Sequence, residues 1–342
     1  MNYKCAIVGL GRIGCGFDDD PSRKSIITHA GSYIVNKKAQ LVSLCDVDES
    51  KLSKYGKKYN VRSLYTDYKK MLSSEKLDCL SVCTLNDSHL EIVEEASKYY
   101  LKGIFLEKPI SNNLENASKI IKLCKDNNIK LQIDHLRRFI PFYWKIKELI
   151  NNKTFGKIQH CSIYYGAGIA NTGSHIFDLI RFFFGDIDWI EAITSNNISN
   201  NPNDPNVDCK VKCKNGVICN LFGFNLNNFG ISEFSIFGSE ARIVINLYNA
   251  TAEYYEKPNS KIGVLYSELA HKPLPIETRT DGIVLGLENL FESIEKNTPT
   301  QCTGEDGYAS LEAIIASLLS AKQHGMRINM PVKEITYTIF SK

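Results

Sequence analysis

A charged pair at the end of an apolar stretch is the first place in this sequence that could do chemistry. Residues 103–106 read Gly-Ile-Phe-Leu, which predicts a short buried strand, and Glu107, Lys108 and Pro109 follow directly. Charged side chains are costly to bury unpaired, so an acid and a base at a strand end indicate a use for them. Pro109 biases Lys108 toward an extended backbone, which would aim the lysine side chain. A solvated strand-to-helix turn is the alternative interpretation.

A glycine-rich turn near the start of the chain predicts a dinucleotide site. It follows an apolar strand predicted at Tyr3–Val8 and reads Gly-Leu-Gly-Arg-Ile-Gly. Glycines at this spacing permit a tight turn and let backbone N–H groups approach a pyrophosphate. A second predicted strand, Leu41–Cys45, precedes an acid placed to accept hydrogen bonds from an adenosine ribose. We expect cofactor contacts from Gly9, Gly11, Arg12, Ile13, Gly14 and Asp46.

The interval between Gly14 and Asp46 is longer than the roughly 20 residues typical of this fingerprint. The excess is the polar segment Cys15–Lys24, with its Asp-Asp-Asp-Pro run, ahead of a helix predicted around Thr28–Lys37. Both a surface loop and a flap over the cofactor or substrate are compatible with this segment.

Strands and helices alternate through the first 133 residues, which predicts a doubly wound parallel sheet. The carboxyl ends of such strands line the ligand crevice, so Thr84 and Asn86 also become cofactor candidates. Ser88 and Glu91 form a capping box that predicts the start of a helix. The other expected strands are 61–65, 77–84 and 129–133, and the other helices are 49–59, 67–72 and 114–126.

The pattern changes after residue 134. Consecutive strand-like runs with short turns predict a largely antiparallel sheet, with the pair Thr303 and Asp306 opening a last helix. The expected class is α/β, with a doubly wound dinucleotide-binding domain at 1–134 and a second α/β domain with a large, mostly antiparallel open sheet at 135–342. The runs are 156–165, 189–194, 207–213, 217–225, 232–237 and 242–247, and the helices are 141–150, 174–184, 282–296 and 303–323.

Composition argues against several other classes of protein. The chain has 342 residues, enough for two domains, and a net charge of +3, too small to indicate nucleic acid or an anionic membrane as a partner. No apolar run reaches the length of a membrane span, and the N-terminus lacks the layout of a signal peptide, so we expect a cytoplasmic protein. Eleven cysteines without a C-x-x-C pair predict reduced, buried thiols and no metal centre.

In their order and spacing these motifs resemble the glucose–fructose oxidoreductase/inositol 2-dehydrogenase (Gfo/Idh/MocA) family over nearly the whole chain. The resemblance implies a Rossmann domain followed by an α/β domain whose open sheet often serves in dimerisation. It also implies a nicotinamide-dependent oxidoreductase of a sugar, polyol or nucleotide sugar, with His89, Glu107 and Lys108 among the cofactor contacts. It rests on the glycine loop, Asp46, Thr84 with His89, Glu107-Lys108-Pro109, Arg137-Arg138-Phe139, Gly173–Asp178, Gly238 and Gly304–Gly307.

The resemblance implies that Lys108 and His175 are catalytic. Oxidising a carbinol needs a proton acceptor and an electrophilic contact for the forming carbonyl, and these two side chains can supply both. Many members carry aspartate four residues before the histidine, where this chain has Asn171, an amide that can hold a sugar hydroxyl but accepts no proton. A loop-capping Asn171 and a core His175 are the alternatives. We expect substrate contacts from Lys108, Asn171, His175, Tyr165 and Arg137.

Asp46 favours NAD over NADP, because its carboxylate would repel a 2′-phosphate and residues 47–49 supply no cation. The sheet of the second domain has few helices to cover it, which predicts a homodimer or homotetramer.

Two classes of function remain open at this point. One is a sugar-type dehydrogenase or ketoreductase, favoured by the presence of both Lys108 and His175. The other is a dinucleotide-binding sensor of the same fold without turnover, favoured by Asn171.

Overall fold

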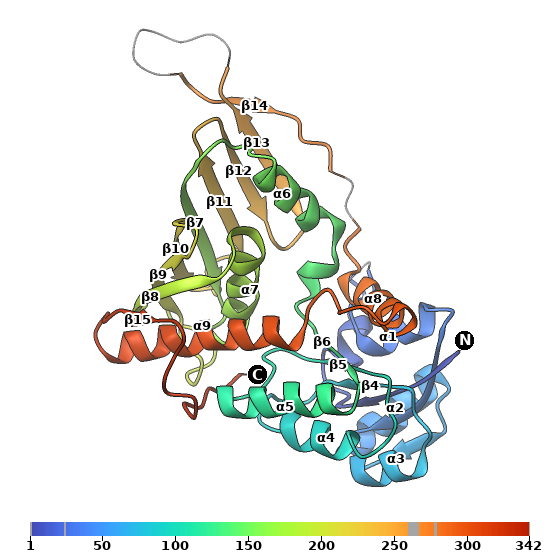
Figure 1. Ribbon diagram of the computed structural model, residues 1–342. Coiled ribbons are helices and arrows are strands. Elements are labelled where there is room, and N and C mark those ends of the chain that lie inside the picture. Colours follow the sequence, from blue (N-terminus) through green and yellow to red (C-terminus); the bar gives the residue numbers. More distant parts are fainter. Residues whose placement is uncertain (1, 24, 259–266, 277–278, 342) are drawn as a thin grey trace. The chain divides into compact units, whose positions relative to one another are not determined.

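The computed structural model describes residues 2–23, 25–258, 267–276 and 279–341, and within them the chain forms two compact units (Figure 1). The first unit comprises residues 1–139, 281–311 and 335–342, and the second comprises residues 140–280 and 312–334. Lys24, the last residue of the predicted insertion, lies outside the described residues.

Among the described residues, the first unit is built on a six-stranded parallel sheet with the strand order β3-β2-β1-β4-β5-β6. Strands β4 and β5 are buried along their whole length, as expected of strands covered on both faces. The order reverses between β1 and β4, the place where open α/β sheets bind ligands. The predicted doubly wound fold is confirmed. The strands are β1 (Tyr3–Val8), β2 (Ala39–Cys45), β3 (Ser63–Tyr65), β4 (Cys79–Val82), β5 (Gly103–Leu106) and β6 (Lys130–Ile133).

Helices cover both faces of this sheet. Helices α1 (His29–Val35) and α8 (Gly282–Lys296) lie on one face, and α4 (His89–Ala96) and α5 (Leu114–Asp126) lie on the other (Figure 1). Helices α2 (Glu49–Tyr59) and α3 (Tyr68–Ser74) follow the second and third strands. At four of these helices the residue before the first turn has a polar side chain that accepts a hydrogen bond from an N–H of that turn. These residues are Thr28, Asp48, Asp67 and Asn113.

Helix α8 packs on the Rossmann sheet, although our division after residue 134 places it in the second domain. The ring of Phe291 in α8 stacks on Tyr3 of β1 at 4.4 Å between centroids, and Gln132 Nε2 donates to the carbonyl of Gly286 at 2.6 Å. Helix α9 (Gly304–Lys322) begins in the first unit and continues in the second. Periodicity shows that α8 has an apolar face, but not which sheet that face covers.

The described residues of the second unit form a nine-stranded sheet with the order β14-β13-β12-β11-β7-β10-β9-β8-β15. Its neighbours pair antiparallel except for β7 and β10, which are parallel, so the predicted mostly antiparallel sheet is confirmed. Strands β13, β14 and β15 extend it beyond the predicted runs. The strands are β7 (Ile158–Gly166), β8 (Ile187–Thr194), β9 (Val207–Cys213), β10 (Ile218–Phe224), β11 (Glu233–Gly238), β12 (Ala241–Asn246), β13 (Thr251–Glu256), β14 (Ala270–Lys272) and β15 (Ile328–Asn329).

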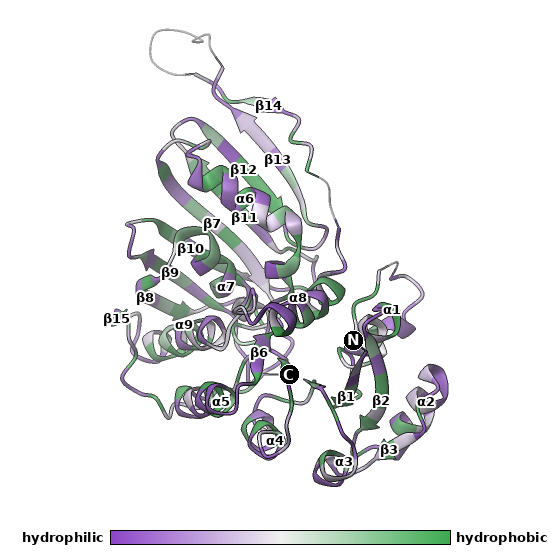
Figure 2. Cartoon of the chain, turned by 45° about the vertical axis from the view of Figure 1, so that its right-hand side comes forward, coloured by the Kyte–Doolittle hydropathy of each residue, from purple (hydrophilic) through white to green (hydrophobic). Residues whose placement is uncertain are grey.

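One face of this sheet forms the core of the second unit. Hydrophobic and hydrophilic stretches change places along the strands of this sheet (Figure 2). In β9 every second residue is buried, namely Val207, Cys209, Val211 and Cys213, so these residues share the buried face. Helices α6 (Pro141–Asn151) and α7 (Thr172–Phe184) and the later part of α9 supply its cover. Ser320 of α9, for example, accepts a hydrogen bond from the main chain of β8.

The expectation about the thiols is confirmed, because all eleven cysteines are described and each is a buried free thiol. In the part of the chain that the structure describes, no helix combines the length and the apolar content needed to cross a membrane.

Candidate active site

The carboxyl ends of four parallel strands are level with one another in the first unit. Val8 pairs with Cys45 on one side and with Val82 on the other, and Val82 pairs with Leu106. The residues that come next therefore share one edge of the sheet. This edge brings together Gly9, Asp46, Thr84, Glu107 and Lys108, all of which the sequence singled out.

Glycine is needed at the three positions of the loop for different physical reasons. A Cβ on Gly9, whose φ is +95°, would lie 2.7 Å from the carbonyl group of Cys83, and a Cβ on Gly14 would lie 2.1 Å from the carbonyl oxygen of Gly9. A Cβ on Gly11 would meet no atom of the described residues within 4 Å. Gly11 therefore leaves its backbone open to a pyrophosphate, as the middle glycine of the fingerprint should. The loop fits a dinucleotide.

The insertion interrupts the connection between the glycine loop and α1 without separating them. The N–H groups of His29 and Ala30 donate to the carbonyls of Ile13 and Gly14 at 3.1 and 2.9 Å. The start of helix α1 is thus hydrogen-bonded directly to the glycine loop, and the insertion begins and ends beside this loop.

The inserted segment is attached to α2 and to the glycine loop. Asp19 pairs with Lys54 at 2.8 Å and with Lys58 at 2.5 Å. Burial would raise the pKa of Asp19, but hydrogen bonds from these lysines and from Tyr55 lower it to about 2. Phe17 lies under two guanidinium groups, that of Arg12 at 4.7 Å and that of Arg23 at 4.6 Å. The described part of the insertion is therefore an ordered extension of the Rossmann unit.

Asp46 braces the glycine loop. Its Oδ2 accepts the N–H of Leu10 at 2.7 Å and its Oδ1 accepts the N–H of Asp48 at 3.0 Å. Lys51 Nζ lies 3.7 Å from the same carboxylate. The three residues after Asp46 supply no cation that could accept a 2′-phosphate, but Lys51 supplies one from the first turn of α2.

His89 and Asn86 hold the loop after β4 instead of presenting their side chains to a cofactor. The His89 ring is fully buried between the carbonyls of Thr84 and Ile110, each 3.2 Å from a ring nitrogen, and burial lowers its pKa. Asn86 Nδ2 donates to the carbonyl of Ser111 at 3.2 Å. Both side chains therefore connect this loop to the segment after Pro109, an indirect role that sequence reasoning did not assign.

The capping box predicted at α4 is wrong, although the helix is present. The Ser88 hydroxyl is directed to Leu85 O and Thr84 Oγ1, each at 2.8 Å, and not to the first turn of the helix. The side chain of Thr84 is thereby fixed at the strand end.

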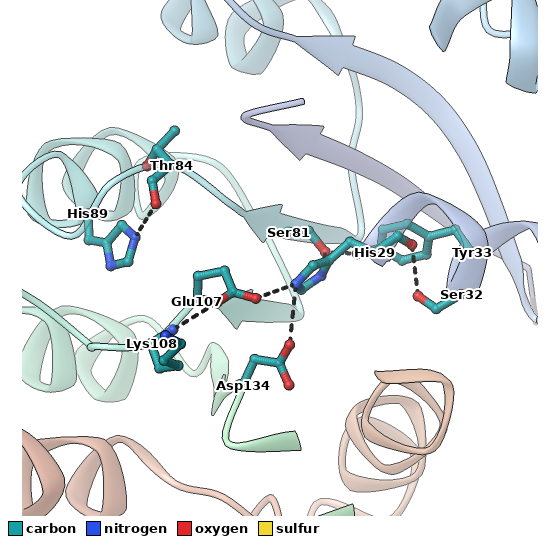
Figure 3. Close-up of polar contacts among 9 residues, drawn as sticks. All are labelled: His29, Ser32, Tyr33, Ser81, Thr84, His89, Glu107, Lys108 and Asp134. Atoms are coloured by element: carbon teal, nitrogen blue, oxygen red, sulfur yellow. Dashed lines mark hydrogen bonds and ion pairs between the residues drawn. The ribbon is translucent and has the colours of Figure 1, made fainter. Parts of the chain in front are cut away.

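Lys108 is half-buried at the end of β5, and its peptide bond to Pro109 is cis. The side chain of Glu107 turns inward, where Oε1 lies 3.2 Å from His29 Nε2 and Oε2 accepts the N–H of Lys108 at 3.2 Å (Figure 3). Glu107 is only 7% exposed. We therefore do not retain Glu107 as a cofactor contact, because its oxygens are engaged inside the protein.

The pKa values of two buried carboxyl groups, Glu107 after β5 and Asp134 after β6, shift in opposite directions. Burial would raise the pKa of Glu107, but the hydrogen bond and charge of His29 and the charge of Lys108 hold it below its ordinary value. Burial and the charge of Glu107 raise the pKa of Asp134 well above its ordinary value. These opposite shifts in pKa favour the ionised form of Glu107 and the neutral form of Asp134.

Asn171 and His175 lie in the second unit, at the start of α7. Asn171 precedes the helix, its side-chain amide donates to Ala167 O at 3.3 Å, and its N–H donates to the buried Asp204 at 2.9 Å. His175 is half-buried one turn later. Residues four apart share a helix face, so the two side chains belong to one side of the helix start.

Tyr165 is not supported as a substrate contact. It is fully buried on β7, and its hydroxyl donates to Val207 O and accepts from Val207 N, both at 2.8 Å. Arg137 is half-buried in the short helix η2 (Leu136–Phe139) of the first unit. Its neighbour Arg138 pairs with Asp306 at 3.2 Å, which is a structural role.

Sequence reasoning missed His29, Asp134 and Lys51. His29 is separated from the glycine loop in the sequence by the insertion. Its position next to this loop can be recognised only when the inserted residues are left out. Asp134 carried a signal, since it is an acid immediately after a predicted buried strand. Lys51 was missed because the search stopped before the first turn of α2.

Comparisons with known proteins agree with this geometry. Residues 3–135 match the profile of an oxidoreductase family with an NAD-binding Rossmann fold, and residues 165–244 match the C-terminal domain of the same Gfo/Idh/MocA family. The chain belongs to this family, and its first unit is an NAD-binding Rossmann fold.

Three relatives illustrate the range of the family. Myo-inositol 2-dehydrogenase of Thermotoga maritima is 23% identical over 90% of this chain and 93% of its own. D-apiose dehydrogenase of Paraburkholderia graminis is 29% identical over 54% of this chain and 51% of its own. The structure of the WlbA dehydrogenase of Bordetella pertussis, in complex with NADH and UDP-GlcNAcA, superimposes with a TM-score of 0.77 at 18% identity, covering 97% of this chain and 100% of that one. The last likeness concerns the fold alone.

The glycine loop gives a matched pair of variants. Gly11→Ala adds a methyl group where the described structure leaves space, so the melting temperature should stay near that of the wild type while NAD binding weakens by about tenfold or more. Gly14→Ala places a Cβ against the carbonyl of Gly9 and should lower stability by about 2 kcal/mol or more. Thermal unfolding and calorimetric titration with NAD measure both, and equal effects of the two variants on NAD binding would contradict the assignment.

Proposed function

We propose that this protein is an NAD-dependent dehydrogenase or ketoreductase of a hydroxyl or keto group in a sugar, polyol or nucleotide sugar. The observation that carries the proposal is the half-buried Lys108 at the same sheet edge as the open Gly11, supported from behind by an ionised carboxylate. The names of the relatives support the substrate class, because they act on inositol or apiose or are seen with a nucleotide sugar.

Gly9–Gly14 and Asp46 would hold the dinucleotide, which when bound supplies the hydride acceptor or donor. Lys108 would donate a hydrogen bond to the reacting oxygen and stabilise its developing negative charge. His175 would take the hydroxyl proton in oxidation and return it in reduction. Asn171 would position a substrate hydroxyl by hydrogen bonding, without adding charge beside the histidine.

Lys108 should be required for turnover but not for cofactor binding. In Lys108→Met the stabilising charge at the reacting oxygen is lost, so turnover with a panel of sugars and nucleotide sugars should become undetectable while the NAD dissociation constant changes less than about threefold. Lys102→Met is the matched control, because Lys102 precedes the same strand and is paired with Asp78 at 2.8 Å.

His175→Asn should lose on the order of 10²–10⁴ in rate, the usual worth of a positioned acid or base. Near-normal turnover of Lys108→Met would remove the catalytic assignment. Bound NAD without turnover of any panel member by the wild type would favour the sensor, the function that Asn171 suggests.

The preference for NAD over NADP is tested at Asp46 and Lys51. The carboxylate should repel a 2′-phosphate, so the wild type should bind NAD more tightly than NADP, and Asp46→Ala should narrow the gap. Lys51→Ala should weaken whatever NADP binding exists, because it removes the cation 3.7 Å from Asp46. Fluorescence titrations with both reduced cofactors measure this, and equal affinities in the wild type would overturn the preference.

We also propose that the second unit forms a homodimer or a dimer of dimers through the less buried face of its sheet. Tyr164 on this face stacks with Phe222 at 5.9 Å and meets Phe224 edge-on at 5.7 Å, and Phe222 is 42% exposed. Aromatic residues gathered on a flat sheet are typical of protein interfaces.

Light scattering should therefore report at least twice the 38.6 kDa chain mass at micromolar concentration. Phe222→Glu should shift the protein toward monomer, because a charge would be buried at the interface. Phe340→Glu is the control, because it replaces a phenylalanine of the first unit that is 65% exposed. A wild-type monomer would contradict the proposal.

A further inference from the structure

Behind Lys108 lies a fully buried polar cluster that the proposed reaction does not itself require. His29, Glu107 and Asp134 meet where α1 passes the ends of β5 and β6 (Figure 3). His29 Nε2 is 3.2 Å from Glu107 Oε1 and 3.6 Å from Asp134 Oδ2. None of the three is more than 7% exposed, so solvent does little to stabilise their charges.

The other side of the imidazole extends the cluster into the sheet. His29 Nδ1 is 2.8 Å from Ser81 Oγ, and the Tyr33 hydroxyl is 2.7 Å from the same Ser81 oxygen. The Ser81 hydroxyl can exchange hydrogen bonds with both His29 Nδ1 and the Tyr33 hydroxyl, and His29 Nε2–H donates to Glu107. Burial raises the pKa of Tyr33 well above its ordinary value, which keeps it a donor.

This chain of donors ends at the residue that holds Lys108. Glu107 accepts a hydrogen bond from His29 Nε2–H on Oε1 and another from the main-chain N–H of Lys108 on Oε2. The two contacts fix the carboxylate from both ends, so a change at His29 is transmitted through one side chain to the backbone of Lys108. The Lys108 charge in turn helps to lower the pKa of Glu107 and offsets part of the rise in the pKa of Asp134, so the ammonium and the two carboxyl groups act on one another.

The same three residues have the types and spacing of a metal site, since their ligand atoms lie within 4.8 Å of one another. A proton accounts for the geometry better than a cation. Glu107 already uses both oxygens, and the positive charge of Lys108 acts on both carboxyl groups. Asp134 Oδ1 is buried and has no hydrogen-bond partner among the described residues, which is far less costly for a neutral carboxyl than for a carboxylate.

We propose that His29 is a positioning residue for Lys108, which acts through Glu107, and that the Glu107 carboxylate is the negative charge that supports the lysine amine. The catalytic part of this inference rests on the proposed function. The electrostatic part does not, because it concerns the state of the Lys108 amine in the protein without substrate.

The electrostatic part is tested by competitive acetylation of Lys108 with acetic anhydride, measured by mass spectrometry against the exposed Lys37. Glu107→Gln removes the carboxylate charge, and His29→Leu removes the hydrogen-bond donor to that carboxylate. Each change should lower the pKa of Lys108 and so raise its labelling rate, by on the order of tenfold for each unit by which the pKa falls. His29→Gln can still donate to Glu107 and should return the rate toward that of the wild type. Unchanged labelling in folded Glu107→Gln and His29→Leu would overturn the inference whether or not a substrate is known.

The catalytic part is tested with the substrate that the wild type turns over. His29→Leu should lower kcat by on the order of tenfold to a hundredfold, the effect of a displaced catalytic group, with the KM and the NAD dissociation constant nearly unchanged. Thr300→Val is the matched control, because it removes another buried hydrogen bond of the first unit, from Thr300 Oγ1 to Leu131 O at 2.9 Å. If Thr300→Val lowers kcat as much at equal stability, His29 is merely structural and the positioning role is wrong.

Metal analysis of the purified wild-type protein completes the test. Substoichiometric zinc, manganese and iron are expected if a proton holds the cluster together. One bound equivalent that is lost in His29→Leu would replace the proposal with a metal centre.

Discussion

The burial of one negative charge behind Lys108 is the constraint on which the strand-end site depends. A carboxylate in an apolar sheet is costly unless every oxygen is engaged, and Glu107 meets this demand with His29 on one side and the Lys108 main chain on the other. Burial and the charge of Glu107 raise the pKa of its neighbour Asp134 well above its ordinary value, which favours the neutral carboxyl. Ser81 is a polar residue inside the buried strand β4, and Tyr33 is a polar residue on the buried side of α1. Their hydroxyl groups form the hydrogen bonds on the Nδ1 side of the imidazole.

A second constraint is the close approach of the glycine loop to its own strands. Gly9 lies against the end of β4 and Gly14 against Gly9, so the turn is as tight as its atoms allow, while Gly11 leaves the outer side open. Asp46 then fixes the loop to the end of β2 through the N–H of Leu10. The insertion between Gly14 and α1 is tolerated because it begins and ends at one place and is held by its own ion pairs to α2.

Much of this could be predicted from the sequence, because strands and helices have short-range signals. The strands β1 and β5 and the helices α2, α5 and α8 were predicted with the bounds they have. What failed depends on contacts distant in sequence. The apolar face of α8 does not reveal that it covers the Rossmann sheet, and the alternation of β7 does not reveal that the hydroxyl of Tyr165 is bonded to β9. The role of Glu107 was mistaken for the same reason, since its partner His29 lies 78 residues earlier in the chain.

The buried cluster also bears on the choice between an enzyme and a sensor. A protein that only bound a dinucleotide would need the glycine loop and Asp46. The carboxylate of Glu107 contacts His29 and the Lys108 main chain, and it forms no hydrogen bond with the glycine loop or Asp46 among the described residues. An apolar residue in place of a buried charge is often neutral or stabilising, so stability alone gives little reason to keep Glu107 and its donors. A lysine that must hold a developing negative charge does give such a reason, because its ammonium form needs support at a half-buried position. The arrangement around Lys108 therefore favours the proposed dehydrogenase over a protein that only binds a dinucleotide.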